Sequence, residues 1–488
     1  MRDPETIAVI AGIGEVVDRS RDPAATPEPL ELMVQAARVA DGDAGGLLAD
    51  TGRTTVVHQQ SWRYADTARQ FCERCSIPGS VAHYGPYGGE SPVRFLHQAA
   101  SRIAAGTSRT ELIVSGEAQY ARAAAKRQNV ALPWTPIADK EENAFDPAGV
   151  IDPLMAAQGV LAPAQVYPLF ETAYQAHRGQ TPAAGLQASA KLWARYAEVA
   201  AQRPAAWRQD APYAAAIADP ADGNRWIAWP YTKAMVANPQ VNQAAAILVT
   251  SLAEAWRHGL KQEQLVFIGA GAWANEPANW LGRETYHHSP AQAAVLGALA
   301  PAQPDLFELY SCFPVVPKMA ADVLGDKAAQ HPTVTGGLSF FGGPLNSYML
   351  HAAVAMTEAI RAGHGSCGLL YGQGEYVTKH HALLLTREAG QADSYDVQSQ
   401  ADAARGAVPP ILREPKGRFT AEATTVIFDR SGTPEFGVVV ARNGQGRTLA
   451  RVEDEEGITR LLSLAETPVG TAGDVRLDER RRPVWRLA

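Results

Sequence analysis

The segment Gly336-Gly-Leu-Ser-Phe-Phe-Gly-Gly-Pro-Leu-Asn-Ser-Tyr348 is a glycine-rich loop that runs into an apolar helix. The pattern predicts that this helix continues to Arg361 and ends before Gly363. Glycines let a backbone approach another group closely because they carry no side chain. The helix behind the loop would point unpaired N–H groups toward the same place. The stretch therefore predicts a binding site built largely from backbone.

Two apolar strands of the same design begin two halves of the chain. Residues 7–14 and residues 265–272 each read as a buried strand that ends in a glycine turn. A second pair of strands, residues 112–117 and 368–372, follows a helix that ends in glycine in each half. Repeated strand–helix units predict an internally duplicated α/β core. The two first strands should lie side by side at the centre, related by a pseudo-twofold axis.

Changes of composition predict the domain boundaries. An inserted segment rich in proline and alanine has helical stretches such as Ala188 to Ala201, which is typical of a cap over the core. Short alternating strands split by turns predict a small all-β barrel at the end of the chain. The predicted units are an N-terminal half (1–262) with its cap (about 125–225), a C-terminal half (263–388), a linker (389–418) and the β domain (419–488).

Composition excludes several functional classes. The chain has 488 residues, is 46% hydrophobic and 19% charged, and has a net charge of -7. This balance is typical of a soluble globular protein and argues against binding to nucleic acid or to an anionic membrane. No apolar run approaches the roughly 20 residues of a spanning helix. Four cysteines and no visible signal peptide favour a reducing, cytoplasmic setting.

Cys72 and Cys75 form a Cys-x-x-Cys inside a predicted helical run from Asp66 to Ile77. A zinc site normally needs a second pair of ligands, and no such pair or histidine cluster is nearby. We therefore expect no metal and interpret these residues as buried or half-buried helix cysteines.

Several longer motifs, in the right order, resemble the thiolase superfamily, and most closely the thiolase-like protein type 1 group. The motifs are Ser61-Trp-Arg-Tyr64, Gly88-Gly-Glu-Ser-Pro92, Asn224 to Lys233, Leu309-Tyr-Ser-Cys-Phe-Pro314, Tyr376-Val-Thr-Lys-His380 and the glycine loop above. The resemblance covers nearly the whole chain and implies a duplicated, five-layered α/β thiolase fold. The segment from Thr420 to Gly446 looks like the additional OB-like C-terminal domain of that group. The implied ligand is coenzyme A, as an acyl-CoA substrate, and a homodimer is compatible with the resemblance.

The chain departs from a working thiolase where the nucleophile should be. The family places a reactive Cys at the N-terminus of a helix, whose dipole lowers the pKa of the thiol. The corresponding helix is predicted from Pro92 to Ala105 with Ser91 as its cap, and the Cys-x-Ser motif falls on Gly89-Glu90-Ser91. A glycine cannot act as a nucleophile. The family's Gly-His-Pro likewise falls on Gly342-Gly343-Pro344, without the histidine.

Two other catalytic motifs of the family are altered as well. The Asn/His-Glu/Asp-Ala/Cys-Phe motif falls on Tyr310 to Phe313, and the second Cys-x-Gly falls on Leu370-Tyr371-Gly372. The glycines that would supply oxyanion N–H groups remain at Gly89, Gly342 and Gly372. Retro-aldolases of steroid side-chain breakdown are similar relatives that use tyrosines as acid/base groups. Tyr310 and Tyr371 are therefore candidate catalytic residues, and a wall or core aromatic is the alternative interpretation of each.

Three further types of side chain are candidates. Cys312 could supply a thiol, although its family position is usually structural. His351 lies two turns beyond the missing histidine, so a helix histidine with a structural partner is the alternative. Arg225 and Lys233 could meet the coenzyme A phosphates, or form a solvated face. His380 and His381 could line the site or support its loop.

These residues predict a pocket between the two halves that binds an acyl thioester. Its expected lining is Gly89, Tyr310, Cys312, Gly343, Tyr371 and Gly372, with two helix N-termini that converge near Ser91 and Asn346. The first hypothesis is aldol or retro-aldol chemistry on the thioester. The alternative is a non-catalytic coenzyme A or acyl-CoA binding protein. Acyl transfer through another thiol is disfavoured by Gly89. The C-terminal domain is expected to dock on the core or to cover the pocket mouth.

Overall fold

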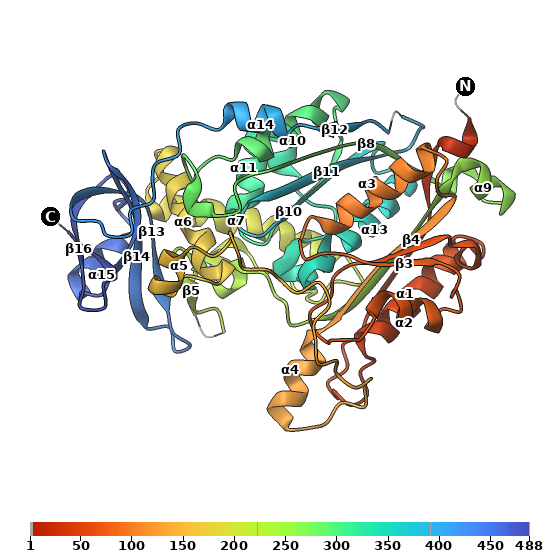
Figure 1. Ribbon diagram of the computed structural model, residues 1–488, viewed down its shortest axis with the longest axis horizontal. Helices are drawn as coiled ribbons and strands as arrows, with labels where there is room; N and C mark the ends of the chain where they lie inside the picture. Colours follow the sequence, from red (N-terminus) through yellow and green to blue (C-terminus); the bar gives the residue numbers. More distant parts are fainter. Residues whose placement is uncertain (1–2, 222, 391, 488) are drawn as a thin grey trace.

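The structure is a computed structural model that describes residues 3–221, 223–390 and 392–487. Its core is a mixed sheet in the order β3-β2-β4-β7-β1-β8-β11-β10-β9 (Figure 1). Along the chain these strands are β1 (Ala8–Val17), β2 (Arg53–Val56), β3 (Val81–Tyr84), β4 (Thr110–Ala118), β7 (Asn242–Ser251), β8 (Val266–Asn275), β9 (Leu306–Leu309), β10 (Cys367–Gly374) and β11 (Lys379–Thr386).

The two halves meet at β1 and β8. These strands pair antiparallel, with Val9 opposite Phe267 and Ile10 opposite Val266. Outward from this junction the N-terminal half runs β1-β7-β4-β2, and the C-terminal half runs β8-β11-β10-β9. In both halves the first two pairings are antiparallel and the third is parallel. The predicted duplication, and the side-by-side placement of residues 7–14 and 265–272, are confirmed.

Two helices lie between the halves. α3 (Ser91–Ala104) and α13 (Tyr348–Arg361) contact each other and strands of both halves. The outer face of the N-terminal half is covered by α1 (Pro29–Asp43) and α2 (Thr67–Arg74), and that of the C-terminal half by α10 (Pro290–Leu299) and α11 (Val315–Leu324) (Figure 1). The layers therefore alternate helix, sheet, helix, sheet, helix, which is the predicted five-layered thiolase-like arrangement.

Local sequence explains how these layers start and pack. The Ser289 side chain accepts a hydrogen bond from the backbone N–H of Gln292, and Pro290 occupies the first turn, so α10 begins there. On the other side, α1 lies directly on β1. A Cβ added to Gly12 would lie 2.6 Å from the Cβ of Ala44, so this close approach requires glycine.

The inserted segment is largely helical, and its helix α7 with the chain that follows it lies over the glycine-rich loop. Its elements are α4 (Gln119–Gln128), α5 (Pro153–Gln158), α6 (Pro163–His177), α7 (Pro182–Ala201), α8 (Ala214–Ala218), β5 (Trp226–Ala228) and β6 (Tyr231–Thr232). The Trp193 indole on α7 donates to the Ser339 hydroxyl at 2.9 Å. The backbone of Arg208 donates to the Phe340 carbonyl at 3.0 Å. The cap thus fixes the loop from outside.

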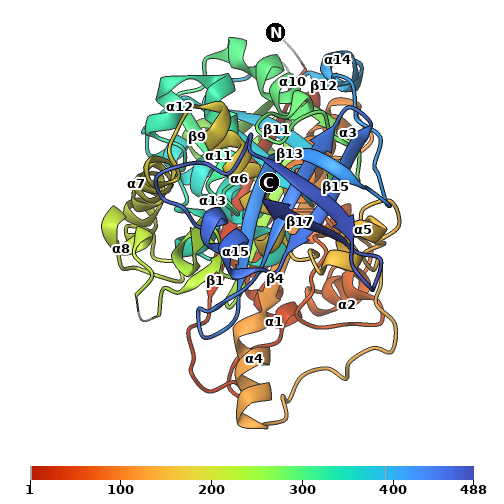
Figure 2. The same cartoon turned by 90° about the vertical axis from the view of Figure 1, so that its left-hand side faces the viewer.

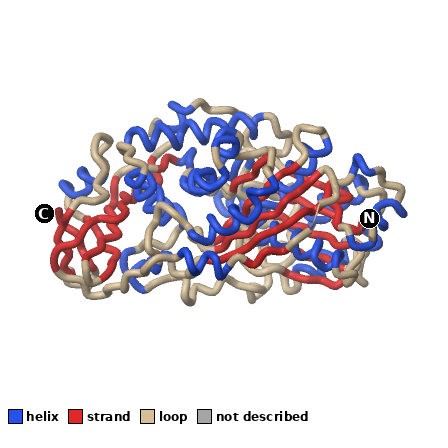
Figure 3. Tube along the Cα trace, turned by 90° about the horizontal axis from the view of Figure 1, so that it is seen from above, coloured by secondary structure: helices blue, strands red, loops and turns tan. Residues whose placement is uncertain are grey.

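The C-terminal domain is a closed five-stranded barrel that lies in front of the core in Figure 2. Its elements are β13 (Gly417–Phe428), β14 (Pro434–Asn443), β15 (Gly446–Val452), α15 (Glu455–Leu461), β16 (Ala472–Leu477) and β17 (Pro483–Leu487). The strand order β14-β15-β17-β16-β13 closes through pairing of β13 with β14. Phe419, Val439 and Trp485 belong to its own apolar core. The predicted all-β barrel is confirmed, and from above its strands form a separate group far from the N-terminus (Figure 3).

Part of the segment predicted as a linker packs on the core. Within residues 389–418, β12 (Ser394–Asp396) pairs in parallel with β8, and α14 (Gln398–Ala404) contacts α10. The barrel is also joined to the cap, because Ala228 of β5 pairs with Ile427 of β13. The cap hairpin therefore extends the barrel sheet. No helix within the described ranges is long and apolar enough to cross a membrane.

The remaining short elements are α9 (Leu252–Arg257), α12 (Asp326–Gln330), the 3-10 turns Pro4–Thr6, Leu47–Asp50, Lys233–Met235, Gln262–Gln264, Trp280–Gly282, Ala300–Ala302 and Leu345–Ser347, and the π turn Gly337–Phe341.

Candidate functional site

The first wall of the site is the N-terminus of α3. Pro92 lies in the first turn, and Gly106 follows the helix with a φ of +67°. Ser91, predicted as the cap, is already helical, and the N-cap residue is Glu90. The reason is that the N–H of Ser91 donates to the carbonyl of Gly88 at 3.1 Å, so the turn closes one residue early. The dipole of α3 therefore points at Gly89 and the space in front of it.

Tyr310 fills the space in front of Gly89. A Cβ added to Gly89 would lie 2.5 Å from the Tyr310 hydroxyl oxygen and 2.6 Å from the carbonyl oxygen of Gln373. No side chain fits at position 89 while Tyr310 is in place. Burial raises the pKa of Tyr310 well above its ordinary value, so the phenol stays protonated. At neutral pH it can donate a hydrogen bond or a proton, and it is not a base.

Cys312 and two polar neighbours form the next part of the wall. The Gln373 side-chain amide donates to the Cys312 sulfur at 3.3 Å and to the Tyr167 hydroxyl at 2.8 Å. The Tyr167 hydroxyl in turn donates to the carbonyl of Glu375 at 2.6 Å. Burial raises the pKa of Cys312 to about 12. The thiol is thus protonated and is not poised as a nucleophile.

These residues line one cavity of about 520 Å³, which we call the central cleft. It lies between the two halves and the cap helix α6, and it brings together four of the predicted residues: Gly89, Tyr310, Cys312 and Gly343. Sequence reasoning missed Tyr167, Gln373 and Glu375, which also line it, whereas Asn346 was expected there as the start of a helix. No local sequence pattern indicated the three missed residues, because each reaches the cleft through tertiary contacts.

Tyr371 and Gly372 do not line the central cleft. The Tyr371 hydroxyl is engaged elsewhere, 2.8 Å from Nδ1 of His380 and 3.0 Å from the side-chain amide of Gln292 on α10. Gly372 packs against α3, since a Cβ there would lie 3.0 Å from the Cα of Glu90. The predicted lining is therefore wrong for these two residues. Tyr371 supports the sheet behind the cleft, together with His380.

The glycine-rich loop joins the two halves through Asn346. Its side-chain oxygen accepts from the N–H of Gly88 at 3.3 Å, and its amide donates to the carbonyl of His58 at 3.1 Å. Gly342 has a φ of +125°, a conformation that favours glycine, and Gly343 lines the cleft. The helix α13 begins two residues after Asn346, because a 3-10 turn comes first.

His351 lies outside the cleft. It is fully buried on α13, with Nδ1 2.6 Å from Oε1 of Glu15, and its ring packs against Phe341. It lines neither of the cavities described here. The structural alternative for this histidine therefore fits its surroundings, and the catalytic interpretation does not.

The two candidate phosphate ligands are also outside the cleft. The Arg225 guanidinium donates to the carbonyls of Trp226 and Asp429, so it ties the cap to a barrel turn. Lys233 is exposed on a 3-10 turn. Neither lines the central cleft.

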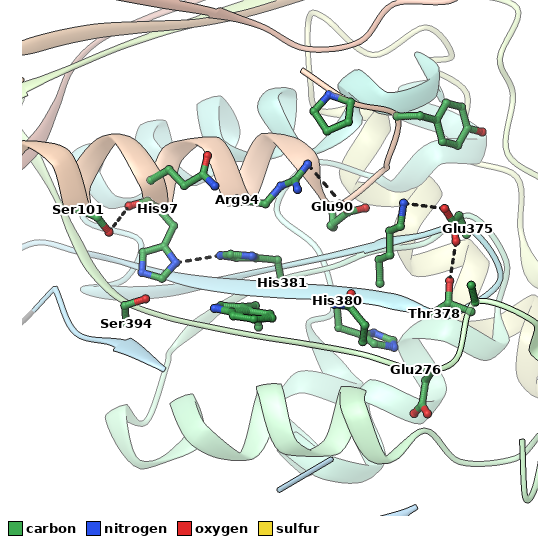
Figure 4. A pocket seen from close by; sticks show the side chains of 17 residues that line it. Glu90, Arg94, His97, Ser101, Glu276, Glu375, Thr378, His380, His381 and Ser394 are labelled. Carbon is green, nitrogen blue, oxygen red and sulfur yellow. Dashed lines mark hydrogen bonds and ion pairs between the residues drawn. The ribbon is translucent and has the colours of Figure 1, made fainter. Parts of the chain in front are cut away.

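A second cavity of about 760 Å³, the side cleft, lies on the other side of α3 (Figure 4). The N-cap residue Glu90 and one face of α3, with Arg94, His97 and Ser101, form one wall, and β11 supplies His381 from the opposite wall. Tyr87 and Glu375 line both clefts. The recurrence of polar residues along one face of α3, opposite its apolar face, is the sequence signal that corresponds to this cleft.

Buried titratable groups dominate the side cleft. Nδ1 of His97 lies 2.9 Å from Nε2 of His381, and burial lowers the pKa of His97 to about 4 and that of His381 well below its ordinary value. Both rings are therefore neutral at pH 7. Burial raises the pKa of Glu90, whose Oε2 has no hydrogen-bond partner among the described residues. Arg94 is 3.9 Å from that carboxyl group.

The Cys-x-x-Cys lies where the sequence places it, at the end of α2. Cys72 is buried and Cys75 half-buried, both thiols are free, and burial raises the pKa of Cys75 to about 12. Within residues 3–221, 223–390 and 392–487, no three His, Cys, Asp or Glu side chains are grouped to hold a metal ion.

Comparisons with known proteins identify proteins of similar sequence and fold. Residues 396–480 match the family model of the thiolase-like protein type 1 additional C-terminal domain. A monomeric SCP2-thiolase-like protein type 1 from Mycobacterium smegmatis has 26% sequence identity and a TM-score of 0.82, with 100% of both chains covered. No curated protein matched the sequence.

Two further solved structures share the fold at lower identity. The Ltp2–ChsH2(DUF35) aldolase has 18% identity and a TM-score of 0.57, over 79% of this chain and 98% of the other. An acetyl-CoA acetyltransferase from Syntrophomonas wolfei has 13% identity and a TM-score of 0.56, over 78% and 99%. The chain therefore has a thiolase-like fold and resembles the thiolase-like protein type 1 group, including its extra C-terminal domain.

Proposed function

We propose that the central cleft binds an acyl thioester of coenzyme A, and that the chain makes or breaks a carbon–carbon bond in it by aldol or retro-aldol chemistry. One observation carries the proposal. The Tyr310 hydroxyl occupies the space of a side chain at position 89, at the N-terminus of α3, where a working thiolase would hold its nucleophile. A protonated phenol therefore takes the place of a thiol.

The surroundings suit an enolate. The N-terminus of α3 and its N–H groups favour negative charge on the thioester oxygen. Tyr310 can hydrogen-bond to that oxygen or donate a proton to the α-carbon, because burial keeps the phenol protonated. Glu375 is the only carboxylic acid among the described residues that line the central cleft, and its Oε1 is 2.6 Å from Nζ of Lys379. We assign to it the role of base.

In the cleavage direction, the proposed reaction needs no reactant other than the thioester, because all protons and electrons are accounted for. Glu375 accepts the proton of the β-hydroxyl group, the bond between the α- and β-carbons breaks, and a carbonyl product leaves. The electron pair passes into the thioester enolate, and Tyr310 protonates the α-carbon. A proton then returns from Glu375 to Tyr310 through solvent. The aldolase named in the comparison with Ltp2–ChsH2 supports this reaction class by likeness of fold alone.

A second candidate function is thioester binding without turnover. It is favoured by the absence of an activated nucleophile at Tyr310 and Cys312, because burial raises the pKa of both groups and neither is ionised at pH 7. In this alternative Tyr310 is a hydrogen-bond donor to the bound carbonyl and nothing more.

The experiment is incubation with a panel of acyl-CoA and β-hydroxyacyl-CoA thioesters, with products followed by mass spectrometry. We expect an aldehyde or ketone and a shortened thioester from at least one β-hydroxyacyl-CoA. Tyr310→Phe and Glu375→Gln should each lower turnover roughly 10²–10⁴-fold, as loss of an acid or base does.

Measuring thioester binding apart from turnover distinguishes the two proposed functions. Tyr310→Phe should leave the Kd of a non-reactive acyl thioester nearly unchanged, because only the hydroxyl group is lost. If no member of the panel is cleaved but thioesters bind, the binding function replaces the catalytic one. If no thioester binds, both are wrong.

A further inference from the structure

As far as the structure describes it, the C-terminal barrel does not line the central cleft. Among the described residues, none from 417 onward lines either cleft. The barrel nevertheless contacts one segment that does, and a loop of the C-terminal half that hydrogen-bonds to another. On one side, the Thr172 hydroxyl of α6 donates to the carbonyl of Thr424 at 2.9 Å and accepts from its N–H at 3.0 Å. α6 also carries Tyr167 into the cleft.

On the other side, Arg447 of β15 hydrogen-bonds to the backbone of a loop of the C-terminal half, residues 281–284, which we call the gripped loop. This side chain is fully buried, and Glu422 of β13 holds it in the barrel, with Nε 2.6 Å from Oε2. Its guanidinium donates to three carbonyls of the core: Leu281 at 2.9 Å, Glu284 at 2.8 Å, and Arg283. A planar fork with several donors is required to satisfy so many acceptors at once.

The gripped loop carries a second buried arginine. Arg283 is 3% exposed, and its guanidinium donates to the carbonyls of Tyr376 (3.2 Å) and Val377. The N–H of Val377 in turn donates to the side-chain oxygen of Gln373 at 3.1 Å. The amide of Gln373 then reaches the Cys312 sulfur and the Tyr167 hydroxyl. An unbroken series of hydrogen bonds thus leads from the barrel to the wall of the cleft.

The segment at the middle of this series is strained. Glu375 has a φ of +56° and Val377 a φ of +58°. A β-branched residue in this region is a rare and costly conformation, which persists only where surrounding contacts hold it. The two carbonyls that accept from Arg283, those of Tyr376 and Val377, flank the α-carbon of Val377. Those contacts are therefore suited to holding the strained backbone.

We propose that the C-terminal barrel positions the strained segment Glu375–Thr378, and with it Gln373 and Glu375, through Arg447 and Arg283. Arg447 is a positioning residue, and no sequence motif indicated this role. The inference rests on the proposed function only in taking the central cleft as the ligand site, and its test requires no ligand.

The accessibility of the Cys312 thiol reports whether Gln373 and the segment after it are held in place. It is buried at 8% exposure, and Gln373 hydrogen-bonds to its sulfur. The rate of Cys312 alkylation by iodoacetamide can be followed by peptide mass spectrometry in the full chain. Cys72, which is 2% exposed in the N-terminal half, reports opening of the whole core in the same sample.

Arg447→Met keeps the length of the side chain and removes every donor. We expect Cys312 alkylation to accelerate by roughly tenfold or more through local opening, with the Cys72 rate unchanged. Arg451→Met is the matched control: Arg451 is also on β15, but it bonds to Gln158 and Glu453 and does not touch the gripped loop. This control should leave the Cys312 rate at the wild-type value.

Arg447→Lys carries the test if Arg447→Met does not fold, because lysine keeps the charge but reaches fewer carbonyls. It should give a smaller rise of the Cys312 rate. An unchanged Cys312 rate in a folded Arg447 variant overturns the inference. An equal rise in Arg451→Met also overturns it, since general loosening of the barrel would then be the cause. Neither result bears on thioester cleavage by the wild type, so the two proposals fail separately.

Discussion

Replacing Gly89 with alanine should destabilise the core, because the new methyl group would enter the space of the Tyr310 hydroxyl. The Cβ would lie 2.5 Å from that oxygen, 2.6 Å from the Gln373 carbonyl oxygen and 3.0 Å from the ring carbon that bears the hydroxyl. A carbonyl and a buried ring cannot move aside as a flexible side-chain end can. Overpacking of this kind costs about 1–3 kcal/mol.

The measurement is the midpoint of urea unfolding. The midpoints of the variant and the wild type are compared provided that the dependence of the unfolding free energy on urea concentration is the same in both. Gly42→Ala is the matched control. Gly42 lies in the last turn of α1, and a Cβ there would meet nothing within 4 Å. That substitution should stabilise the chain by about 0.5–1 kcal/mol, because glycine is unfavourable in a helix. The two substitutions should therefore shift the midpoint in opposite directions.

Tyr310→Phe tests the cause of the effect. Removing the hydroxyl oxygen removes the shortest of the three contacts, so Gly89→Ala should cost less in the phenylalanine background. Contacting residues typically couple by about 0.5–3 kcal/mol in such a cycle. If Gly89→Ala costs the same in both backgrounds, or costs nothing, Tyr310 does not fill the space in front of α3 and the reasoning is refuted.

Two other predictions concern thiol chemistry and pH. Cys312→Ser should change thioester turnover by less than about tenfold, because its thiol is protonated and is not a nucleophile; thiolysis of acetoacetyl-CoA that the substitution abolished would contradict this. Stability should fall as the pH drops from 6.5 toward 4, because burial lowers the pKa of His97 to about 4 in the folded state, and the unfolded chain then binds more protons. The slope is roughly 1.4 kcal/mol per pH unit for one such group. His97→Gln should lower the slope by the contribution of this one group, with His381 still contributing, and an equal slope in the variant would show that the His97 ring does not resist protonation.

Much of the fold could be predicted from short apolar stretches. Residues 7–14 and 265–272 are buried in the core sheet, and buried strands must be apolar on both faces, so the duplication is visible in sequence. The docking of residues 394–404 could not be predicted in this way. Ser394–Asp396 is exposed along its length, so its pairing with β8 leaves no apolar pattern.

The site could be predicted in part. Gly89 and Tyr310 were found because their motifs stand in the family's order. Tyr371 was placed in the pocket on the same ground, but its hydroxyl bonds to Gln292 of α10, far away in sequence. Order along the chain fixes which strand a residue lies on, and does not fix what its side chain reaches. Gln373 was missed for the same reason.

The pseudo-twofold explains why polar groups from both halves meet at the cleft. β9 of the C-terminal half corresponds to β2 of the N-terminal half, and α13 corresponds to α3. The loop after β9 carries Tyr310 to Gly89, just before α3 of the other half. The loop after β2 carries His58 to Asn346, just before α13 of the other half. Each half thus contributes the end of a strand to the helix N-terminus of its neighbour. The duplicated topology sets the two meeting points, whereas the identities of Tyr310 and His58, one phenol and one imidazole, make the two contacts chemically different.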